Sequence, residues 1–143
     1  MKYLVSLLTL TAGISLSQTS VACSCPVTLQ TEAQVVDAML RDATLIFVGR
    51  VSRSLLPTLQ QPKRGFRFEV QENFKGVTSQ SLVVLSALSS AECGTTVAPG
   101  KTYLVAAYGA TAPLIHICER PLEVEFASER LALLRERRNH RSP

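Results

Sequence analysis

Two cysteines separated by one residue, Cys23 and Cys25, directly follow an apolar N-terminal segment and strongly limit what this chain can fold into. Residues 1–22 begin with one lysine, continue through a mostly apolar stretch from Tyr3 to Leu16, and end on small residues. This order is typical of a secretory signal peptide, and the apolar stretch is shorter than the roughly 20 residues of a membrane span. We therefore predict a mature chain that begins at Cys23, has no transmembrane segment, and is secreted or periplasmic.

The mature chain is expected to be a single monomeric domain. Its 121 residues are enough to bury one hydrophobic core. The body, residues 23–134, contains ten basic and ten acidic residues, whereas residues 135–143 contain four arginines and one glutamate. The excess positive charge therefore lies in a short basic tail, which we predict to be disordered. A neutral body with few strand aromatics does not favour nucleic-acid binding.

The four cysteines, Cys23, Cys25, Cys93 and Cys118, all lie in the exported part of the chain. An even number of cysteines in an oxidising compartment indicates two disulfide bonds. A bond between Cys23 and Cys25 would close a very small strained ring, so two long-range bridges are favoured. A zinc site is disfavoured, because the spacings include no Cys-x2-Cys pair and the chain has only two histidines.

The hydrophobic pattern predicts a mainly β domain with a helix at each end. Apolar residues fall on one helical face at 28–42 and again at 122–134. Runs of apolar residues, some of them alternating with polar ones, predict five strands at 45–53, 66–71, 81–87, 102–108 and 114–119. This arrangement indicates a small, partly open five-stranded barrel of the oligonucleotide/oligosaccharide-binding (OB) type, and a two-layer α+β sandwich is the alternative.

Two patterns that are typical of enzymes fit this chain poorly. Five residues separate Gly94 from Gly100 where a phosphate-binding loop requires four, and a predicted strand follows where that loop requires a helix. His116 and Cys118 lie two residues apart on one predicted strand, as a nucleophile and its base can. A cysteine in a disulfide has no nucleophilic thiolate, however. We therefore expect no enzymatic activity and no cofactor.

The order of these features resembles the netrin-like (NTR) domain of the tissue inhibitors of metalloproteinases (TIMPs), in its short bacterial form. The resemblance spans nearly the whole mature chain. It implies a five-stranded OB-like barrel, and it implies bridges from Cys23 to Cys93 and from Cys25 to Cys118. The segments that carry it are Cys23-Ser24-Cys25-Pro26, Phe47-Val48-Gly49-Arg50-Val51, Phe74-Lys75-Gly76, Cys93-Gly94, Gly100-Lys101-Thr102-Tyr103-Leu104-Val105, and Cys118 before the last helix.

In the animal inhibitors of this family, the N-terminal cysteine binds the catalytic zinc of the target protease through its α-amine and carbonyl oxygen. The side chain of the next residue enters the specificity pocket. By resemblance, these roles fall on Cys23 and Ser24, and the expected partner is a zinc metalloendopeptidase. This chain departs from those inhibitors, because Pro26 follows Cys25 directly and because it lacks the third bridge and the C-terminal cysteine-rich domain.

The alternative function is a non-inhibitory NTR-type binding module of the cell envelope. Cysteine at the first mature position is also the residue that lipidation requires, and an acyl group on the amine of Cys23 would exclude zinc chelation. The usual lipidation signal has leucine three residues before that cysteine, whereas this chain has Ser20. The sequence therefore favours a free amine at Cys23.

Overall fold

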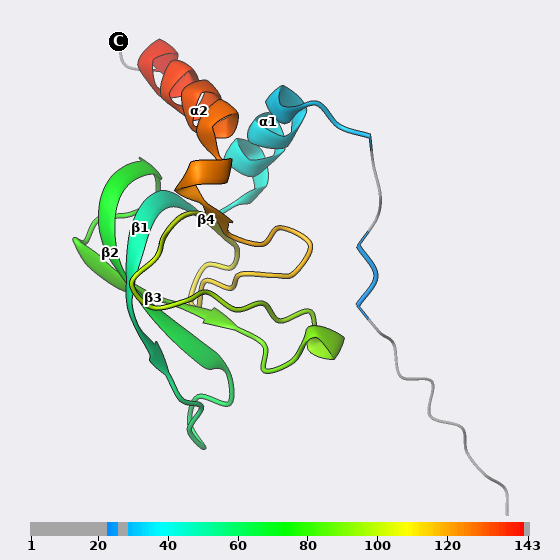
Figure 1. Ribbon diagram of the computed structural model, residues 1–143, viewed down its shortest axis with the longest axis vertical. Helices are drawn as coiled ribbons and strands as arrows, with labels where there is room; N and C mark the ends of the chain where they lie inside the picture. The colour runs from blue at the N-terminus through cyan, green and yellow to red at the C-terminus, as the bar shows by residue number, and fades with distance from the viewer. Residues whose placement is uncertain (1–22, 26–28, 142–143) are drawn as a thin grey trace, which may run out of the picture.

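The computed structural model describes residues 23–25 and 29–141, and it is mainly β with two flanking helices (Figure 1). The predicted signal peptide, residues 26–28 and the last two residues lie outside this described part. The elements in chain order are α1 (Glu32–Asp42), β1 (Leu45–Leu55), β2 (Arg64–Lys75), β3 (Ser81–Ser86), the 3-10 helix η1 (Ser90–Glu92), β4 (Thr102–Ala107), β5 (Leu122–Glu123), the 3-10 helix η2 (Val124–Phe126) and α2 (Ser128–Arg141).

The five strands form one antiparallel sheet in the order β3-β2-β1-β4-β5. The alternation that predicted β2 is reflected in its burial, since Phe66 and Phe68 are buried whereas Glu69 is exposed. Irregularities interrupt the register between β1 and β2 at three places, and such irregularities increase the local twist. The prediction of a mainly β domain with five strands is confirmed, but this sheet is not closed.

The predicted fifth strand at residues 114–119 is not a continuous strand. Only Leu114 pairs, through a parallel bridge with Leu85 of β3 and an antiparallel bridge with Tyr108 after β4. The chain then bends and turns at residues 117–119, so the strand pairing cannot continue. The fifth strand of the sheet is instead β5, a two-residue strand that pairs with β4.

Helix α1 begins four residues later than the predicted start at residue 28, because Thr31 is its N-cap. The Oγ1 of Thr31 accepts a hydrogen bond from the Gln34 N–H at 3.3 Å, and the Gln34 Oε1 accepts one from the Thr31 N–H at 2.9 Å. This capping box satisfies backbone donors that have no partner within the helix. The buried face of α1 consists of Val36, Met39 and Leu40.

Two hydrophobic clusters cover the two faces of the central strands. Along β1, Ile46 and Val48 belong to the cluster beneath the helices, whereas Phe47 and Val51 belong to the cluster on the opposite face. Figure 1 shows α1 and α2 together at one end of the sheet. The helix-side cluster also contains Val36, Met39, Leu40, Leu104, Leu131 and Leu134. The other cluster also contains Phe66, Phe68, Val84, Val97, Tyr103, Val105 and Ile115.

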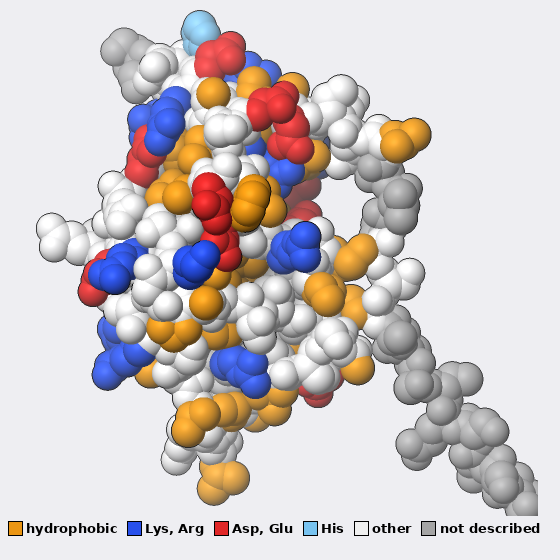
Figure 2. All heavy atoms as spheres, in the orientation of Figure 1, with side chains coloured by type: hydrophobic (Ala, Val, Ile, Leu, Met, Phe, Trp, Pro, Cys, Tyr) orange, Lys and Arg blue, Asp and Glu red, His pale blue; other side chains and the backbone are white. Residues whose placement is uncertain are grey.

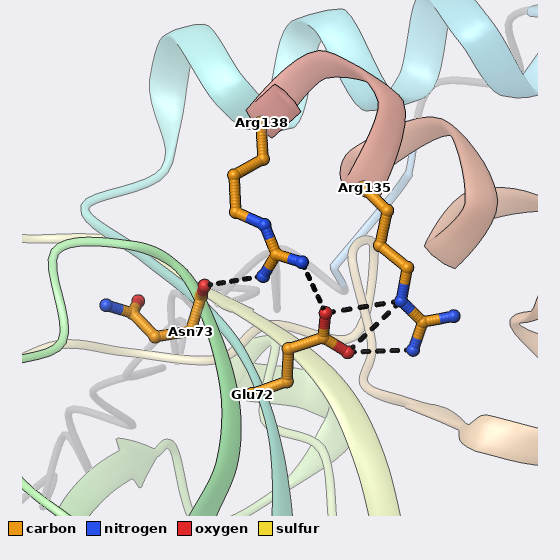
Figure 3. Close-up of polar contacts among 4 residues, drawn as sticks. All are labelled: Glu72, Asn73, Arg135 and Arg138. Carbon is orange, nitrogen blue, oxygen red and sulfur yellow. Dashed lines mark hydrogen bonds and ion pairs between the residues drawn. The ribbon is translucent and has the colours of Figure 1, made fainter. Parts of the chain in front are cut away.

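Helix α2 extends as far as Arg141, into the segment 135–143 that we predicted to be a disordered tail. Residues 135–141 are helical, and residues 122–126, which we predicted to be helical, instead form β5 and η2. Glu72 of β2 explains part of this difference, because two arginines of α2 bind its carboxylate (Figure 3). The Nη2 of Arg135 lies 2.7 Å from Glu72 Oε2, and the Nη2 of Arg138 lies 3.0 Å from Oε1.

Arg138 makes further contacts that hold the C-terminal part of α2 against β2. Its Nη1 donates a hydrogen bond to the carbonyl oxygen of Asn73 at 3.3 Å, as Figure 3 shows. Its guanidinium carbon also lies 5.1 Å from the centroid of the Phe74 ring, which is a cation–π contact. The hydrogen bonds from Arg135 and then from Arg138 hold the pKa of Glu72 below its ordinary value.

Candidate functional site

The two N-terminal cysteines are bonded to two different loops. Cys23 is bonded to Cys93 and Cys25 to Cys118, with a Cα–Cα distance of 5.2 Å in each bridge. This pairing is the one that the resemblance implied, and no cysteine of the described residues is free. Because its sulfur is in a disulfide, Cys118 cannot form a nucleophilic pair with His116.

Cys93 has an unusual backbone conformation. It follows η1 with φ 63°, and it is the one residue other than glycine with positive φ in ranges 23–25 and 29–141. For a residue with a β-carbon this conformation costs about 1 kcal/mol or more. The next residue, Gly94, is buried, and a β-carbon there would collide with the backbone carbonyl of Ala87. The Cys93-Gly94 pair is therefore suited to the tight turn that directs Cys93 toward the N-terminal segment.

The two loops that carry the distant cysteines are hydrogen-bonded to each other. The backbone N–H of Ile117 donates to the carbonyl oxygen of Cys93 at 3.0 Å. At the end of β3, Ser86 is fully buried, and its Oγ accepts a hydrogen bond from the N–H of Thr95 at 2.8 Å. The same hydroxyl donates to the carbonyl oxygen of Ile115 at 3.3 Å. These bonds connect the two loops into one unit.

Ser86 is a site residue that sequence reasoning missed. We predicted the surrounding segment, 81–87, as a short apolar strand, and we assigned no role to the serine near its end. The one signal that the sequence contains is a hydroxyl residue within an otherwise apolar buried run, because a buried hydroxyl requires hydrogen-bond partners. Those partners lie 9 and 29 residues away in the sequence, so they cannot be identified without the fold.

The short segment from Cys23 to Cys25 is held at both ends and is accessible between them. Cys23 is partly buried, whereas Ser24 and Cys25 are exposed. Each cysteine is bonded to one of the two connected loops, so the backbone of Ser24 is restrained from both sides. A side chain at position 24 is therefore presented to solvent by a backbone with little freedom to move.

A cavity of about 530 Å³ adjoins the bridge between Cys25 and Cys118. It lies between α1, β4 and the loop before β5, and its lining includes Met39, Leu104, Leu122, Arg41, Glu119 and Arg130. Carboxylates of α1 bind two of the three arginines in the lining, and the lining's other acid, Glu119, offsets the charge of the third, Arg120. Arg130 Nε lies 2.7 Å from Glu32 Oε2, and Arg41 Nη2 lies 2.8 Å from Asp42 Oδ2. The charge of this cavity therefore does not favour an anionic ligand.

The titratable and metal-binding side chains around the described site are not arranged as a metal centre or as a proton-transfer site. Within the ranges 23–25 and 29–141, no group of three or more His, Cys, Asp or Glu side chains is arranged to hold a metal ion. Burial is the main cause that raises the pKa of Tyr108, and the nearby Glu119 carboxylate raises it further. The Tyr108 hydroxyl therefore stays protonated at neutral pH, and it is not poised for proton transfer.

Comparison with known proteins finds no matching family model and no matching curated sequence. In the part of the chain that the structure describes, no helix has the length and apolar character needed to cross a membrane. The fold and the site define a small, mainly β protein whose N-terminal Cys-x-Cys segment is cross-linked to two connected loops.

Proposed function

We propose that this chain is an exported TIMP-like inhibitor that binds the catalytic zinc of a metalloendopeptidase through the N-terminal amine and carbonyl oxygen of Cys23. The observation that carries the proposal is the double cross-link of Cys23 and Cys25 to two loops that are hydrogen-bonded to each other. A segment held in this way can insert into a protease cleft with little loss of conformational entropy on binding.

The proposed scaffold is an NTR-type OB-like barrel, and the hydrogen bonds around Leu114 support it. Leu114 and Tyr108 exchange two backbone hydrogen bonds, of 2.8 and 2.9 Å. On the other side, the Leu85 N–H donates to the Pro113 carbonyl at 2.9 Å, and the Ile115 N–H donates to the Leu85 carbonyl at 2.8 Å. One short segment thus connects β3 with the end of β4, and a partly open barrel requires such a connection.

The zinc chemistry depends on the amine that signal-peptide removal would create at Cys23. A catalytic zinc keeps one coordination position open for water or substrate. An α-amine and the carbonyl oxygen of the same residue can occupy that region together as a five-membered chelate. Since an α-amine has a pKa of about 8, a useful fraction is neutral at pH 7 and can donate its lone pair. The disulfides would hold both donor atoms in place.

Selective acetylation of the Cys23 amine tests this proposal. The mature protein should inhibit at least one member of a panel of zinc endopeptidases, and acetylation should abolish inhibition without lowering Tm. Carrying out the reaction at about pH 6.5 leaves lysine amines protonated and directs the reagent to the α-amine. One alanine added before Cys23 should have the same effect, because it moves the amine by about 3.8 Å. An alanine added at the C-terminus is the matched control and should leave inhibition unchanged.

Three outcomes would contradict the proposal in different ways. Inhibition that survives both N-terminal changes would mean that another surface binds the protease. An intact mass that includes a diacylglycerol group on Cys23 would exclude chelation by its amine. A free amine at Cys23 together with no inhibition across the panel would favour the non-inhibitory NTR-type envelope module.

A further inference from the structure

The hairpin formed by β1 and β2 presents two leucines to solvent. The strands stay paired as far as Leu55 and Gly65, and the loop beyond them carries Leu56, which is 86% exposed, and Leu59, which is 101% exposed. Figure 2 shows hydrophobic side chains at the lower end of the molecule, where Figure 1 places the end of this hairpin. Folding thus leaves both leucine side chains in water, which is unfavourable in free energy for apolar surface.

The hairpin loop is locally ordered rather than loosely extended. The Thr58 N–H donates to the Gln61 carbonyl oxygen at 2.8 Å, and the Gln61 N–H donates to the Thr58 Oγ1 at 3.0 Å. These two bonds close a turn around Leu59. The two strands pair as far as Leu55 and Gly65, directly before the loop, so the turn holds Leu59 at the outer end of the hairpin.

Four cations lie at or beside the paired ends of the two strands, and we name them the basic collar: Arg53, which is exposed, and Lys63, Arg64 and Arg67, which are half-buried. Figure 2 shows basic side chains just above the hydrophobic end of the molecule. The sequence contains no acidic residue from position 50 to position 68. All eleven acidic side chains of the chain lie in the described residues, and none of them forms an ion pair with the collar.

The basic collar is electrostatically costly for the folded protein alone. Arg53 and Arg67 are direct partners in the register of β1 and β2, and like charges opposite one another are destabilising. The Nε of Arg67 is also buried without a hydrogen-bond partner among residues 23–25 and 29–141. The equal numbers of acidic and basic residues in the body are therefore unevenly distributed, because residues 50–68 contain basic side chains and no acidic one.

We propose that the β1–β2 hairpin binds the surface of an anionic lipid bilayer, with Leu56 and Leu59 in the interface and the basic collar against the lipid phosphates. Exposed apolar side chains combined with clustered cations are the chemistry that binds such a surface. A nucleic acid would use the cations but would not need the leucines, and the loop has no aromatic side chain for stacking. This inference does not rest on the proposed protease inhibition.

Vesicle sedimentation with the oxidised mature chain tests the inference. The protein should bind vesicles of phosphatidylcholine mixed with phosphatidylglycerol but not vesicles of phosphatidylcholine alone, and added salt should weaken binding. The double variant Leu56→Ser/Leu59→Ser should lower the partition coefficient at least about tenfold, because it removes the apolar side chains. Lys63→Gln/Arg64→Gln should lower it about 30-fold, at about 1 kcal/mol per cation.

Control variants elsewhere on the surface test whether these effects are specific to the hairpin. Phe126→Ser removes an apolar side chain that is 75% exposed outside the hairpin, and Arg41→Gln/Arg120→Gln removes two exposed cations. Both variants should bind the anionic vesicles as the unmodified protein does. Tm should be recorded for each variant, so that loss of binding is separated from loss of folding.

Tryptophan fluorescence locates the contact, because the chain contains no tryptophan. The emission of Leu59→Trp should shift to shorter wavelength on addition of the anionic vesicles, whereas that of Phe126→Trp should not shift. Lack of binding to the anionic vesicles, or equal shifts for both reporters, would overturn the inference. Binding that is unchanged in Leu56→Ser/Leu59→Ser would also overturn it, because the leucines would then not enter the interface. If the unmodified protein self-associates without lipid and Leu56→Ser/Leu59→Ser does not, the hairpin is instead a contact between copies of the chain.

Discussion

The backbone N–H of Ile117 donates a 3.0 Å hydrogen bond to the carbonyl oxygen of Cys93, which joins the two loops that anchor the N-terminal segment. Cys93 is bonded to Cys23, and the residue after Ile117 is bonded to Cys25. A displacement of one anchor is therefore transmitted to the other. The N-terminal segment is therefore bonded to two loops that are held to each other.

The first prediction concerns the hydroxyl of Ser86, which bonds to both anchor loops. In Ser86→Ala, the partly buried N–H of Thr95 and the buried carbonyl of Ile115 both lose a partner. An unsatisfied buried group costs about 1–3 kcal/mol, so the free energy of unfolding should fall by about that amount. Urea denaturation of the oxidised protein measures this change.

Ser52→Ala is the control for Ser86→Ala. Its hydroxyl also donates to a backbone carbonyl, that of Arg67 at 3.3 Å, but it is exposed, so water can replace the lost bond. This variant should change the free energy of unfolding by less than about 0.5 kcal/mol. Equal effects for the two serines would show that the Ser86 hydroxyl does not fix the loops.

The second prediction concerns the contribution of each disulfide to stability. The bridges join residues that are 70 and 93 positions apart. Loop-closure entropy gives about 4 to 5 kcal/mol for loops of this length, with only a small difference between them. Cys23→Ser/Cys93→Ser and Cys25→Ser/Cys118→Ser should therefore each lower the free energy of unfolding by several kcal/mol. Urea denaturation measures both, and a loss below about 1 kcal/mol in either double variant would contradict the prediction.

Strands with a clear alternation were predictable from the sequence, whereas the end of the sheet was not. In β2, the alternation of Phe66, Phe68 and the polar residues between them gave the strand and its buried face. At residues 114–119, the apolar pattern is equally clear, but the N–H of Ile117 bonds to Cys93 instead of to a neighbouring strand. The two residues of β5 are too few to show any period.

The C-terminal limit of α2 was missed for a related reason. The apolar positions of the helical pattern end at Leu134, so hydrophobic periodicity gives no evidence for the last two turns. Those turns contact β2 through Arg135 and Arg138, whose partner Glu72 lies 63 residues before Arg135. Contacts between polar residues so far apart in sequence become visible only when the fold has placed them together.

The third prediction concerns the pH dependence that Glu72 contributes. Arg135 and Arg138 lower the pKa of Glu72 below its ordinary value of 4.5, so its carboxylate stabilises the fold above that pH. The contribution is lost as pH falls through the lowered pKa, where the folded protein also takes up the proton. Because the ion pairs are partly exposed, Glu72→Gln should cost about 1 kcal/mol or less at neutral pH. The Tm values of the variant and the unmodified protein should converge in acid.

Glu69→Gln provides a matched control on the same strand. Glu69 is exposed and forms no ion pair with any residue of the described part. The difference in Tm between Glu69→Gln and the unmodified protein should be nearly the same at neutral pH and at acidic pH. If Glu69→Gln reproduces the behaviour of Glu72→Gln, the acid sensitivity does not come from the arginines of α2.

The fourth prediction concerns the last turns of α2. Ending the chain at Leu134 removes Arg135 and Arg138 together, and it leaves the Glu72 carboxylate without its partners. The cation–π contact with Phe74 is lost as well. Tm should therefore fall by a few degrees in a domain of this size. A truncated protein with unchanged Tm would indicate that residues 135–143 behave as the disordered tail that the sequence pattern predicted.

The last prediction concerns Ser24 and depends on the proposed inhibition. Ser24 is exposed between two bridged cysteines, so Ser24→Leu should change the free energy of unfolding by less than about 0.5 kcal/mol. A larger apolar side chain at this place should strengthen inhibition of endopeptidases with deep apolar pockets and weaken inhibition of those with small pockets. Inhibition constants across the zinc endopeptidase panel measure both effects. A uniform loss of inhibition for every protease, at unchanged Tm, would show that the side chain at position 24 obstructs binding instead of entering a pocket.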